Sequence, residues 1–243
     1  MGVLYLVSTP IGNREDITLR AIRVLFSVDL IACEDTRKTR NLLEFYEANY
    51  KELLPKSLID KKNYKNLISF YEENEEKRIP FLLDLLKSGK TVGLVSSSGT
   101  PTLSDPGFKL VRECLGQNIK VESIPGPSSI LAALTTSGLP TDKFLFLGFL
   151  PKKQGKRLRW LKNLAKTYQY ISFTTVFFES PYRLTKTLND LKDVFGDIEI
   201  VISRELTKIY EEIRKDKISN HLNRFQKTKP KGEFVLSFNI PQV

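Results

Sequence analysis

The chain of 243 residues has few of the side chains that bind transition metals or act as nucleophiles, with one histidine, His221, and two cysteines, Cys33 and Cys114. A structural zinc site needs about four such ligands, and a Ser-His-Asp triad needs a histidine beside its serine. We therefore expect neither a metal site nor a covalent nucleophile. Both cysteines lie in apolar segments, which favours buried thiols of a cytosolic protein over a disulfide.

Long apolar runs are also missing. The apolar run "FLFLGFL" at residues 144–150 is too short to span a bilayer. The N-terminal segment "MGVLYLVSTPIGN" has no basic residues ahead of its apolar run, so it does not resemble a signal peptide. We expect a cytoplasmic protein that does not associate with membranes.

The glycine-rich signatures of nucleotide sites are absent as well. The loop "VSTPIGN" at residues 7–13 lacks G-x-G-x-x-G, and "GTP" at 99–101 is not followed by G-K-[ST]. Neither a dinucleotide site nor a triphosphate site is predicted. The segment "PGPSSILAAL", in contrast, offers free backbone N–H groups at a helix start, where an anion or a carboxylate can bind.

Positive charge is abundant and unevenly distributed. The net charge is +10; every charged residue in 151–170 is basic, and residues 213–232 are again strongly basic. Such an excess indicates a polyanionic partner, nucleic acid first. In the first stretch, Trp160 and Tyr168 alternate with cations, a combination typical of RNA binding, with a solvated amphipathic helix as the alternative. The predicted RNA contacts there are Lys152, Lys153, Lys156, Arg157 and Arg159.

Apolar, strand-like runs alternate with helix-like segments in the first half of the chain, which predicts a parallel sheet covered on both faces. The second half is richer in strands and aromatic residues, which favours a mixed sheet. We predict an α/β protein of two subdomains, residues 1–116 and 117–243. The predicted strands are 3–7, 29–33, 67–70, 91–95, 120–124, 143–150, 174–180, 198–206 and 232–240. The predicted helices include one capped by Asp16, one whose first turn holds Pro127, and 36–47, 75–88, 108–115, 153–166 and 181–196, with a solvated loop at 51–66.

Three loops of small residues each follow a predicted strand: "STPIGN", "EDTR" and "SSSGTP". The carboxyl ends of parallel strands share one edge of a sheet, so these loops are expected to lie together and bind a ligand. Their small side chains favour a bulky amphipathic cofactor held by backbone contacts and shape. Glu34 and Asp35 of the second loop can deprotonate a hydroxyl, or they simply cap a helix.

Seven segments occur in an order that strongly resembles the ribosomal RNA small subunit methyltransferase I family, within the tetrapyrrole (class III) methylases. They are "LYLVSTPIGNREDITLRAIRVL", "DLIACEDTRKTRNLL", "LVSSSGTPTLSDPG", "IPGPSSILAALTTSGLPTDKFLFLGFLP", "FFESPYRL", "SRELTKIYEE" and "KGEFVLSF". The resemblance implies two α/β subdomains with S-adenosylmethionine in the cleft between them. It also implies 2′-O-methylation of a cytidine ribose in small-subunit (16S) ribosomal RNA, by a homodimer that acts on the assembled 30S subunit.

The resemblance leads to a set of predicted site residues. Glu34 and Asp35 are the candidate bases, with Glu205 behind them, and Lys208, Arg37 and Arg183 can hold phosphates or lower the pKa of the hydroxyl. The predicted cofactor contacts are Pro10, Ser97, Ser98, Gly99, Thr100, Ser128, Ser129 and Phe149.

The chain departs from the family pattern at two places. Ser97 and Ser98 stand where the family has an acid and an alanine, and Glu73 stands where it has histidine. We expect a weaker hold on the cofactor as a result. Two other functions stay open: a small-molecule methylase acting on a tetrapyrrole, and a non-catalytic RNA-binding or ribosome-assembly factor.

Overall fold

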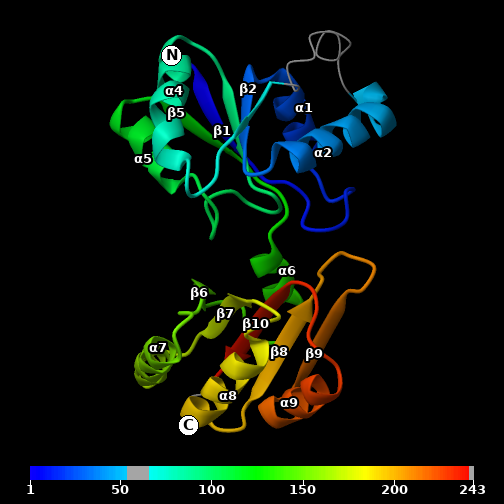
Figure 1. Cartoon of the computed structure of the whole chain (residues 1–243), viewed down its shortest axis with the longest axis vertical. Coiled ribbons are helices and arrows are strands. Elements are labelled where there is room, and N and C mark those ends of the chain that lie inside the picture. The colour runs from blue at the N-terminus through cyan, green and yellow to red at the C-terminus, as the bar shows by residue number, and fades with distance from the viewer. Residues whose placement is uncertain (54–65, 241–243) are drawn as a thin grey trace. The chain divides into compact units, whose positions relative to one another are not determined.

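The computed structural model describes residues 1–53 and 66–240, so most of the predicted loop 51–66 lies outside the described residues (Figure 1). The chain forms two compact units, Met1–Ser128 and Ser129–Val243. The sequence placed the boundary earlier, after residue 116. The difference arises because the strand Lys120–Ile124 pairs with Val3–Val7 and so completes the sheet of the first unit.

The first unit follows the predicted alternation of strands and helices closely. Its elements are β1 (Val3–Val7), α1 (Leu19–Ser27), β2 (Leu30–Cys33), α2 (Thr36–Asn49), the short 3-10 helix η1 (Lys51–Leu53), β3 (Leu67–Ser69), α4 (Glu75–Lys87), β4 (Val92–Val95), α5 (Phe108–Gly116) and β5 (Lys120–Ile124).

The five strands of the first unit form one parallel sheet in the order β3-β2-β4-β1-β5, which confirms the prediction. Alternate residues of each strand face opposite sides, so both faces need an apolar cover. Val7 and Ile31 pack with α1 and α2, whereas Leu4 and Leu94 pack with α4 and α5. Figure 1 shows these helix pairs on the two sides of the sheet.

The start of α1 lies later than the sequence suggested. Thr18, rather than Asp16, is its N-cap, and the Thr18 hydroxyl accepts a hydrogen bond from the Ala21 N–H at 3.1 Å. Threonine and aspartate are both good N-cap residues, so a short polar run leaves the choice between them open.

The second unit is built around a mixed sheet, as predicted. Its elements are α6 (Ser129–Thr136), β6 (Phe144–Phe149), α7 (Gln154–Thr167), β7 (Thr174–Glu179), α8 (Leu184–Phe195), β8 (Glu199–Arg204), β9 (Glu212–Lys217), α9 (Ile218–Lys227) and β10 (Phe234–Asn239). The strand order is β6-β7-β10-β8-β9. Only the pair β6–β7 is parallel, and the pairs β7–β10, β10–β8 and β8–β9 are antiparallel.

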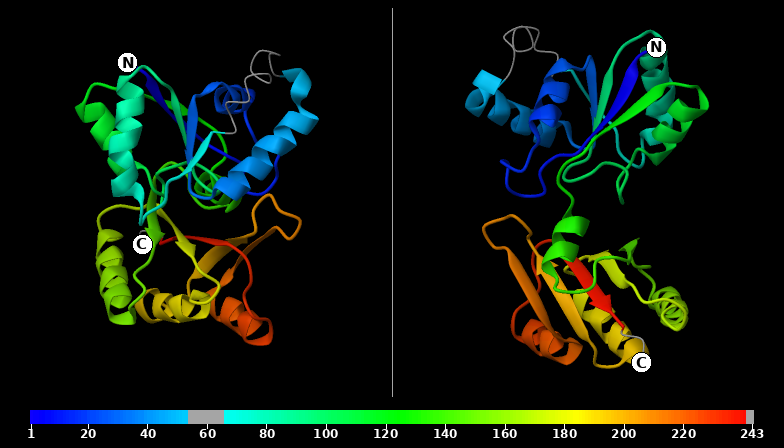
Figure 2. Two further views of the ribbon diagram at one scale, coloured as in Figure 1. Left: turned by 45° about the horizontal axis from the view of Figure 1, so that its top comes forward. Right: turned by 180° about the vertical axis from the view of Figure 1, so that it is seen from behind.

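One face of this sheet is covered by α7, α8 and α9, which share a core with alternate residues of β7, β8 and β10 (Figure 1). The helix α6 packs against β10 and β7 on the other face (Figure 2, right). It begins at Ser129, so Pro127 precedes the helix and is not part of its first turn.

Three features of the second unit differ from the sequence prediction, and one of them is the helix α9, which lies in a stretch described only as strongly basic. The strand β9 (sequence "EIRKDK") was not predicted because its charged residues form an exposed edge strand. Tyr168 was predicted to stack on RNA, but it is buried, lies 4.4 Å from the Phe173 ring and shares a hydrogen bond with Thr175. Its aromatic ring therefore belongs to the core.

Candidate active site

The loops after β1, β2 and β4 lie at one edge of the first sheet, as predicted. Thr9 and Gly99 exchange two backbone hydrogen bonds of 2.9 Å, which join the first loop to the third. The Ser8 hydroxyl donates to Thr100 Oγ1 at 3.1 Å, and Thr100 Oγ1 donates to the Pro127 carbonyl at 3.1 Å. The segment after β5 is thereby tied to the same edge.

Close backbone approach explains two glycines at this edge. Gly99 has a φ of +77°, and an added Cβ would lie 3.3 Å from the Ile11 side chain. A Cβ on Gly126 would lie 2.9 Å from the Cβ of Ser8. Side chains at these positions would push the loops apart, because left-handed backbone and short contacts both favour glycine.

Glu34 connects the second loop to the third. Its Oε2 accepts a hydrogen bond from the Ser97 N–H at 3.1 Å. The departure from the family pattern at Ser97 therefore sits directly beside a candidate base. The Ser97 and Ser98 side chains are exposed, whereas the Gly99 backbone is buried.

Asp105 is not among the predicted site residues, but its surroundings make it a functional candidate. Burial raises the pKa of its carboxyl to about 6, the negative charge of Glu34 adds to the shift, and a hydrogen bond with Ser96 opposes it. Glu34 and Asp105 thus form a pair of interacting carboxylates at the carboxyl edge of the sheet. The available signal was that Asp105 is the only charged residue in 94–107.

A buried carboxylate forms a hydrogen bond to the turn that carries Asp105. Glu75, at the start of α4, accepts a hydrogen bond from the Gly107 N–H at 3.0 Å. Gly107 has a φ of +127°, and a Cβ there would lie 2.5 Å from the Leu94 side chain. Glu73, the second departure from the family pattern, follows β3 at the same edge and is exposed.

Asp35 is occupied as the N-cap of α2. Its Oδ1 accepts hydrogen bonds from the N–H groups of Arg37, at 2.9 Å, and Lys38, at 3.4 Å. The first of these bonds is the main reason that the pKa of Asp35 lies below its usual value. This arrangement is the capping alternative given for the acid pair. Arg37 pairs with Asp35 at 3.5 Å, and its side chain is 90% exposed.

In the second unit, Glu205 and Lys208 hold a turn together. Lys208 Nζ lies 3.1 Å from Glu205 Oε1 and 2.8 Å from Glu233 Oε2, and the Glu233 N–H donates to Glu205 Oε1 at 2.8 Å. Burial is the largest single influence on Glu205 and would raise its pKa, but the Glu233 N–H and Lys208 outweigh it and lower the pKa. A low pKa and these fixed partners make Glu205 a weaker base.

Four of the five cations predicted to contact RNA at the start of α7 are exposed, and their contact with RNA stays a prediction. Lys152, Lys153, Lys156 and Arg159 are exposed. Arg157 is buried, and the prediction that it contacts RNA is therefore corrected.

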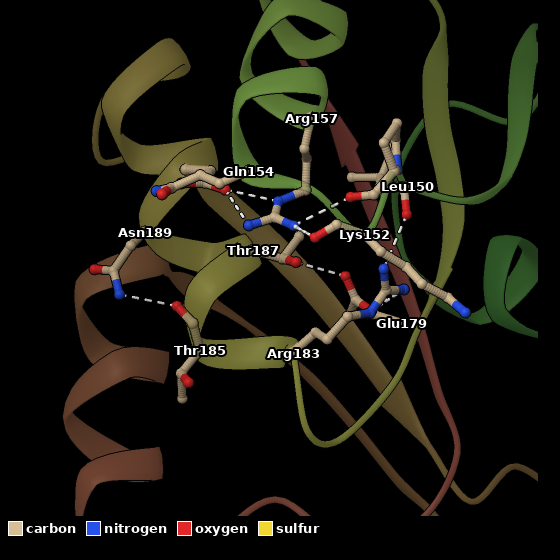
Figure 3. A network of polar contacts seen from close by, with 11 residues as sticks. Leu150, Lys152, Gln154, Arg157, Glu179, Arg183, Thr185, Thr187 and Asn189 are labelled. Atoms are coloured by element: carbon tan, nitrogen blue, oxygen red, sulfur yellow. Dashed lines mark hydrogen bonds and ion pairs between the residues drawn. The ribbon is translucent and has the colours of Figure 1, made fainter.

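The Arg157 guanidinium is fully engaged inside the second unit (Figure 3). Its Nε and Nη2 lie 2.6 and 2.5 Å from Asp190 Oδ2, and Nη1 donates to the carbonyls of Pro151 and Lys152. Gln154 donates to the other Asp190 oxygen at 2.8 Å. These bonds fix α7 on α8, so Arg157 supports the basic surface without being part of it.

Arg183 is similarly committed. Its Nη2 lies 2.6 Å from Glu179 Oε1, and its Nη1 donates to the Leu150 carbonyl at 3.0 Å (Figure 3). Glu179 is buried and also accepts from the Thr187 hydroxyl at 2.5 Å. The Arg183 side chain is 19% exposed, and its bonds join the strand-to-helix turn before α8 to the end of β6.

Residues 3–221 match the family of tetrapyrrole (corrin/porphyrin) methylases. The chain is 46% identical over 236 residues to the ribosomal RNA small subunit methyltransferase I of Thermotoga maritima, covering 97% of each chain. The chain belongs to the ribosomal RNA small subunit methyltransferase I family. The protein of that name from Mycoplasmopsis pulmonis is 42% identical over 243 residues, and the match covers both chains completely.

A solved structure supports the fold of this methyltransferase I family member. Uroporphyrin-III C-methyltransferase from Thermus thermophilus, complexed with S-adenosyl homocysteine, superposes with a TM-score of 0.63. The match covers 97% of each chain at 18% sequence identity. At that identity the likeness shows the fold alone.

The edge of the first sheet fits the S-adenosylmethionine predicted for the methyltransferase I family. The Thr9 hydroxyl is buried and has no hydrogen-bond partner within residues 1–53 and 66–240, so it is available to a ligand. The backbone bridge from Thr9 to Gly99 brings the loop that carries the exposed Ser97 and Ser98 next to Thr9. This set of small polar groups suits an amino acid or ribose moiety.

The other predicted cofactor contacts are distributed over both units of this methyltransferase I family member. Pro10 is buried next to the Thr9–Gly99 bridge, and Ser128 is the last residue of the first unit. Ser129 begins α6, and Phe149 ends β6 with its side chain 55% exposed. Whether these residues contact the cofactor stays a prediction.

The two cysteines and the acidic side chains of the described residues can be compared with what a metal site or a reactive thiol requires. Among the described residues, no three His, Cys, Asp or Glu side chains gather as a metal site would require. Cys33 and Cys114 are free and buried, and burial raises the pKa of each thiol to about 11. In the same part of the chain, no helix is both long and apolar enough to cross a bilayer.

Proposed function

We propose that this chain transfers a methyl group from S-adenosylmethionine to the RNA of the small ribosomal subunit, at the ribose 2′-hydroxyl of a cytidine. The observation that carries the proposal is the 46% identity to a ribosomal RNA small subunit methyltransferase I over 97% of both chains. The sulfonium cofactor supplies an electrophilic methyl group when it is bound.

The chain's own residues bring reactants together and receive the proton. Positioning supplies much of the rate of such a transfer, and a base near the hydroxyl adds to it. Asp35 and Glu205 are held by fixed partners that lower their pKa values. Glu34 and Asp105 lie at the loop edge, and the Asp105 pKa of about 6 suits a proton acceptor at neutral pH. We therefore assign the base to this pair.

RNA binding is assigned to the exposed cations at the start of α7. Lys152, Lys153, Lys156 and Arg159 provide charge, and the neighbouring Trp160 is 38% exposed and available for stacking. A small tetrapyrrole substrate gives no reason for such a surface, which favours the RNA over the tetrapyrrole alternative. The cleft between the two units that the family resemblance implies stays a prediction.

The substrate form and assembly are finer parts of the proposal. We expect methylation on the assembled 30S subunit, in the cytoplasm, by a homodimer. These expectations rest on the family resemblance.

The test is transfer of a tritiated methyl group from S-adenosylmethionine to three acceptors: 30S subunits, naked 16S RNA and a uroporphyrinogen. We expect the label to be incorporated into 30S subunits. We also expect the RNA backbone to resist alkaline cleavage after one cytidine, because a 2′-O-methyl group removes the hydroxyl that alkaline cleavage needs. Incorporation into the tetrapyrrole alone would assign the chain to small-molecule methylation. Tight subunit binding without incorporation into any acceptor would favour the assembly-factor alternative.

A further inference from the structure

A second basic feature lies in the second unit, away from α7. A groove of about 400 Å³ is formed by the end of α9, the segment leading to β10 and the end of β8; we call it the α9–β10 groove. Five of its lining residues are cationic and none is anionic. The cations are Arg204, Arg224, Lys227, Lys229 and Lys231.

The two arginines of the α9–β10 groove are held in place by one carboxylate. Arg224 forms two hydrogen bonds with Glu212 of β9, one from each terminal nitrogen. Arg204 lies 4.0 Å from the same carboxylate and donates from Nε to the Lys231 carbonyl at 2.6 Å. Two guanidinium groups therefore share a single negative charge. The pair of arginines keeps a net positive charge, and its hydrogen bonds fix the two groups in place.

The three lysines of the groove lack such partners. Lys227, Lys229 and Lys231 are exposed, and none forms an ion pair within the part of the chain that the structure describes. Lys227 lies in the last turn of α9, where it also favours the helix C-terminus. Lys229 and Lys231 lie beyond the helix, so their charges do not stabilise its C-terminus. Among the described residues they form no ion pair with a carboxylate.

An apolar wall gives the groove its shape. The half-buried Phe225 ring lies 6.2 Å from the buried Phe234 ring, nearly perpendicular to it. Cations around an apolar wall can hold a phosphate while a sugar or base rests on the ring.

We propose that the α9–β10 groove binds the phosphate backbone of the RNA substrate, as a second contact separate from the cations of α7. The proposal rests on the proposed function. α8 packs against both α7 and α9 and lies between them (Figure 1). The groove and the α7 surface thus contact different segments of one RNA.

The test compares two variants of the full chain with equal loss of charge. The groove variant carries Lys227→Gln, Lys229→Gln and Lys231→Gln. The control variant carries Lys51→Gln, Lys77→Gln and Lys87→Gln, exposed lysines of the first unit that also form no ion pair among the described residues. Circular dichroism and thermal unfolding establish that both variants are folded.

The readouts are the affinity for small-subunit RNA as a function of salt concentration, and KM and kcat for methylation. Each phosphate neutralised contributes about 0.7 to 0.9 to the magnitude of the slope of log affinity against log salt concentration, so three lost contacts reduce that magnitude by about 2 to 3. We expect this decrease, together with a rise in KM that exceeds any change in kcat, for the groove variant only.

Several results would overturn the proposal. An unchanged salt slope and KM in the groove variant, with a wild-type chain that methylates RNA, would refute the groove while leaving the proposed function intact. Equal decreases in both variants would show a general charge effect and no site. Unchanged RNA binding with lost binding to vesicles of anionic lipid would assign the groove to a membrane surface. A wild-type chain that neither binds nor methylates RNA would remove the proposed function and the groove proposal together.

Discussion

Replacement of Arg157 by methionine tests whether this cation is structural. The substitution keeps much of the side-chain volume but leaves the Asp190 carboxylate buried with only Gln154 as a donor. The two side chains are 3% and 1% exposed, so solvent screens their charges very little. Removing one partner of a buried ion pair costs about 3 to 5 kcal/mol.

The expected loss is a large part of the stability of a unit of this size. The free energy of unfolding of a domain is about 5 to 15 kcal/mol. With a urea m-value of about 2 kcal/mol/M, a loss of about 4 kcal/mol lowers the urea concentration at the unfolding midpoint by roughly 2 M. The chain has a single tryptophan, Trp160, and it lies in α7. Its fluorescence during urea unfolding therefore reports on the helix that Arg157 anchors.

Arg159→Met is the matched control, because Arg159 lies in the same helix and is exposed. We expect a change of less than about 0.5 kcal/mol from this variant, and weaker RNA binding. The double variant Arg157→Met/Asp190→Leu should recover much of the stability, since no unpaired charge stays buried. If Arg157→Met unfolds at the wild-type urea concentration and weakens RNA binding as Arg159→Met does, the structural role is refuted.

Three further predictions concern the loop edge. The Asp105 pKa rises from 3.8 to about 6 on folding, so the folded state binds the proton more tightly and the free energy of unfolding decreases as pH rises from about 4 to 6. The half-exposed carboxyl reduces this decrease to about 1 to 2 kcal/mol; Asp105→Asn should abolish it in urea titrations, and an unchanged pH profile would contradict the assignment. Ser97→Asp restores the acid of the family pattern and should tighten S-adenosylmethionine binding in calorimetry, whereas equal affinities would show that the acid is unimportant here. Glu34→Gln should slow methyl transfer by about 10²-fold or more, while Asp35→Asn, which can still cap α2, should stay within a few-fold of wild type. A wild-type rate for Glu34→Gln would remove Glu34 from the assigned base.

The alternation of strands and helices was predictable because it depends on local patterns. The runs of β1, β2 and β4 are apolar throughout, which is typical of strands in a parallel sheet with two covered faces, and the helix-like segments between them favour that arrangement. The exposed strand β9 has no such pattern. It is held to β8 mainly by backbone hydrogen bonds, and its Lys215 pairs with Glu199 of β8. Its sequence therefore resembles the solvated segments around it.

The candidate site divides in the same way. The shared edge of the three loops followed from strand order, which the parallel alternation already implied. The roles of single charges did not follow, because each depends on a partner distant in sequence. Arg157 is buried in an ion pair with Asp190, whereas its neighbour Lys156 is exposed. The pKa of Asp105 is raised partly by the negative charge of Glu34. Counting charges along a helix or loop cannot distinguish such cases.

The position of β10 in the second sheet has a consequence for synthesis of the chain. In the first unit the last strand, β5, adds to the edge of a sheet whose other strands are already made, so that unit can complete itself while the rest is still being translated. β10 instead lies between β7 and β8, which do not pair with each other. Until residues 234–239 leave the ribosome, β6–β7 and β8–β9 are separate ribbons with open edges. The risk that open strand edges pair with another chain during synthesis is therefore much greater for the second unit than for the first.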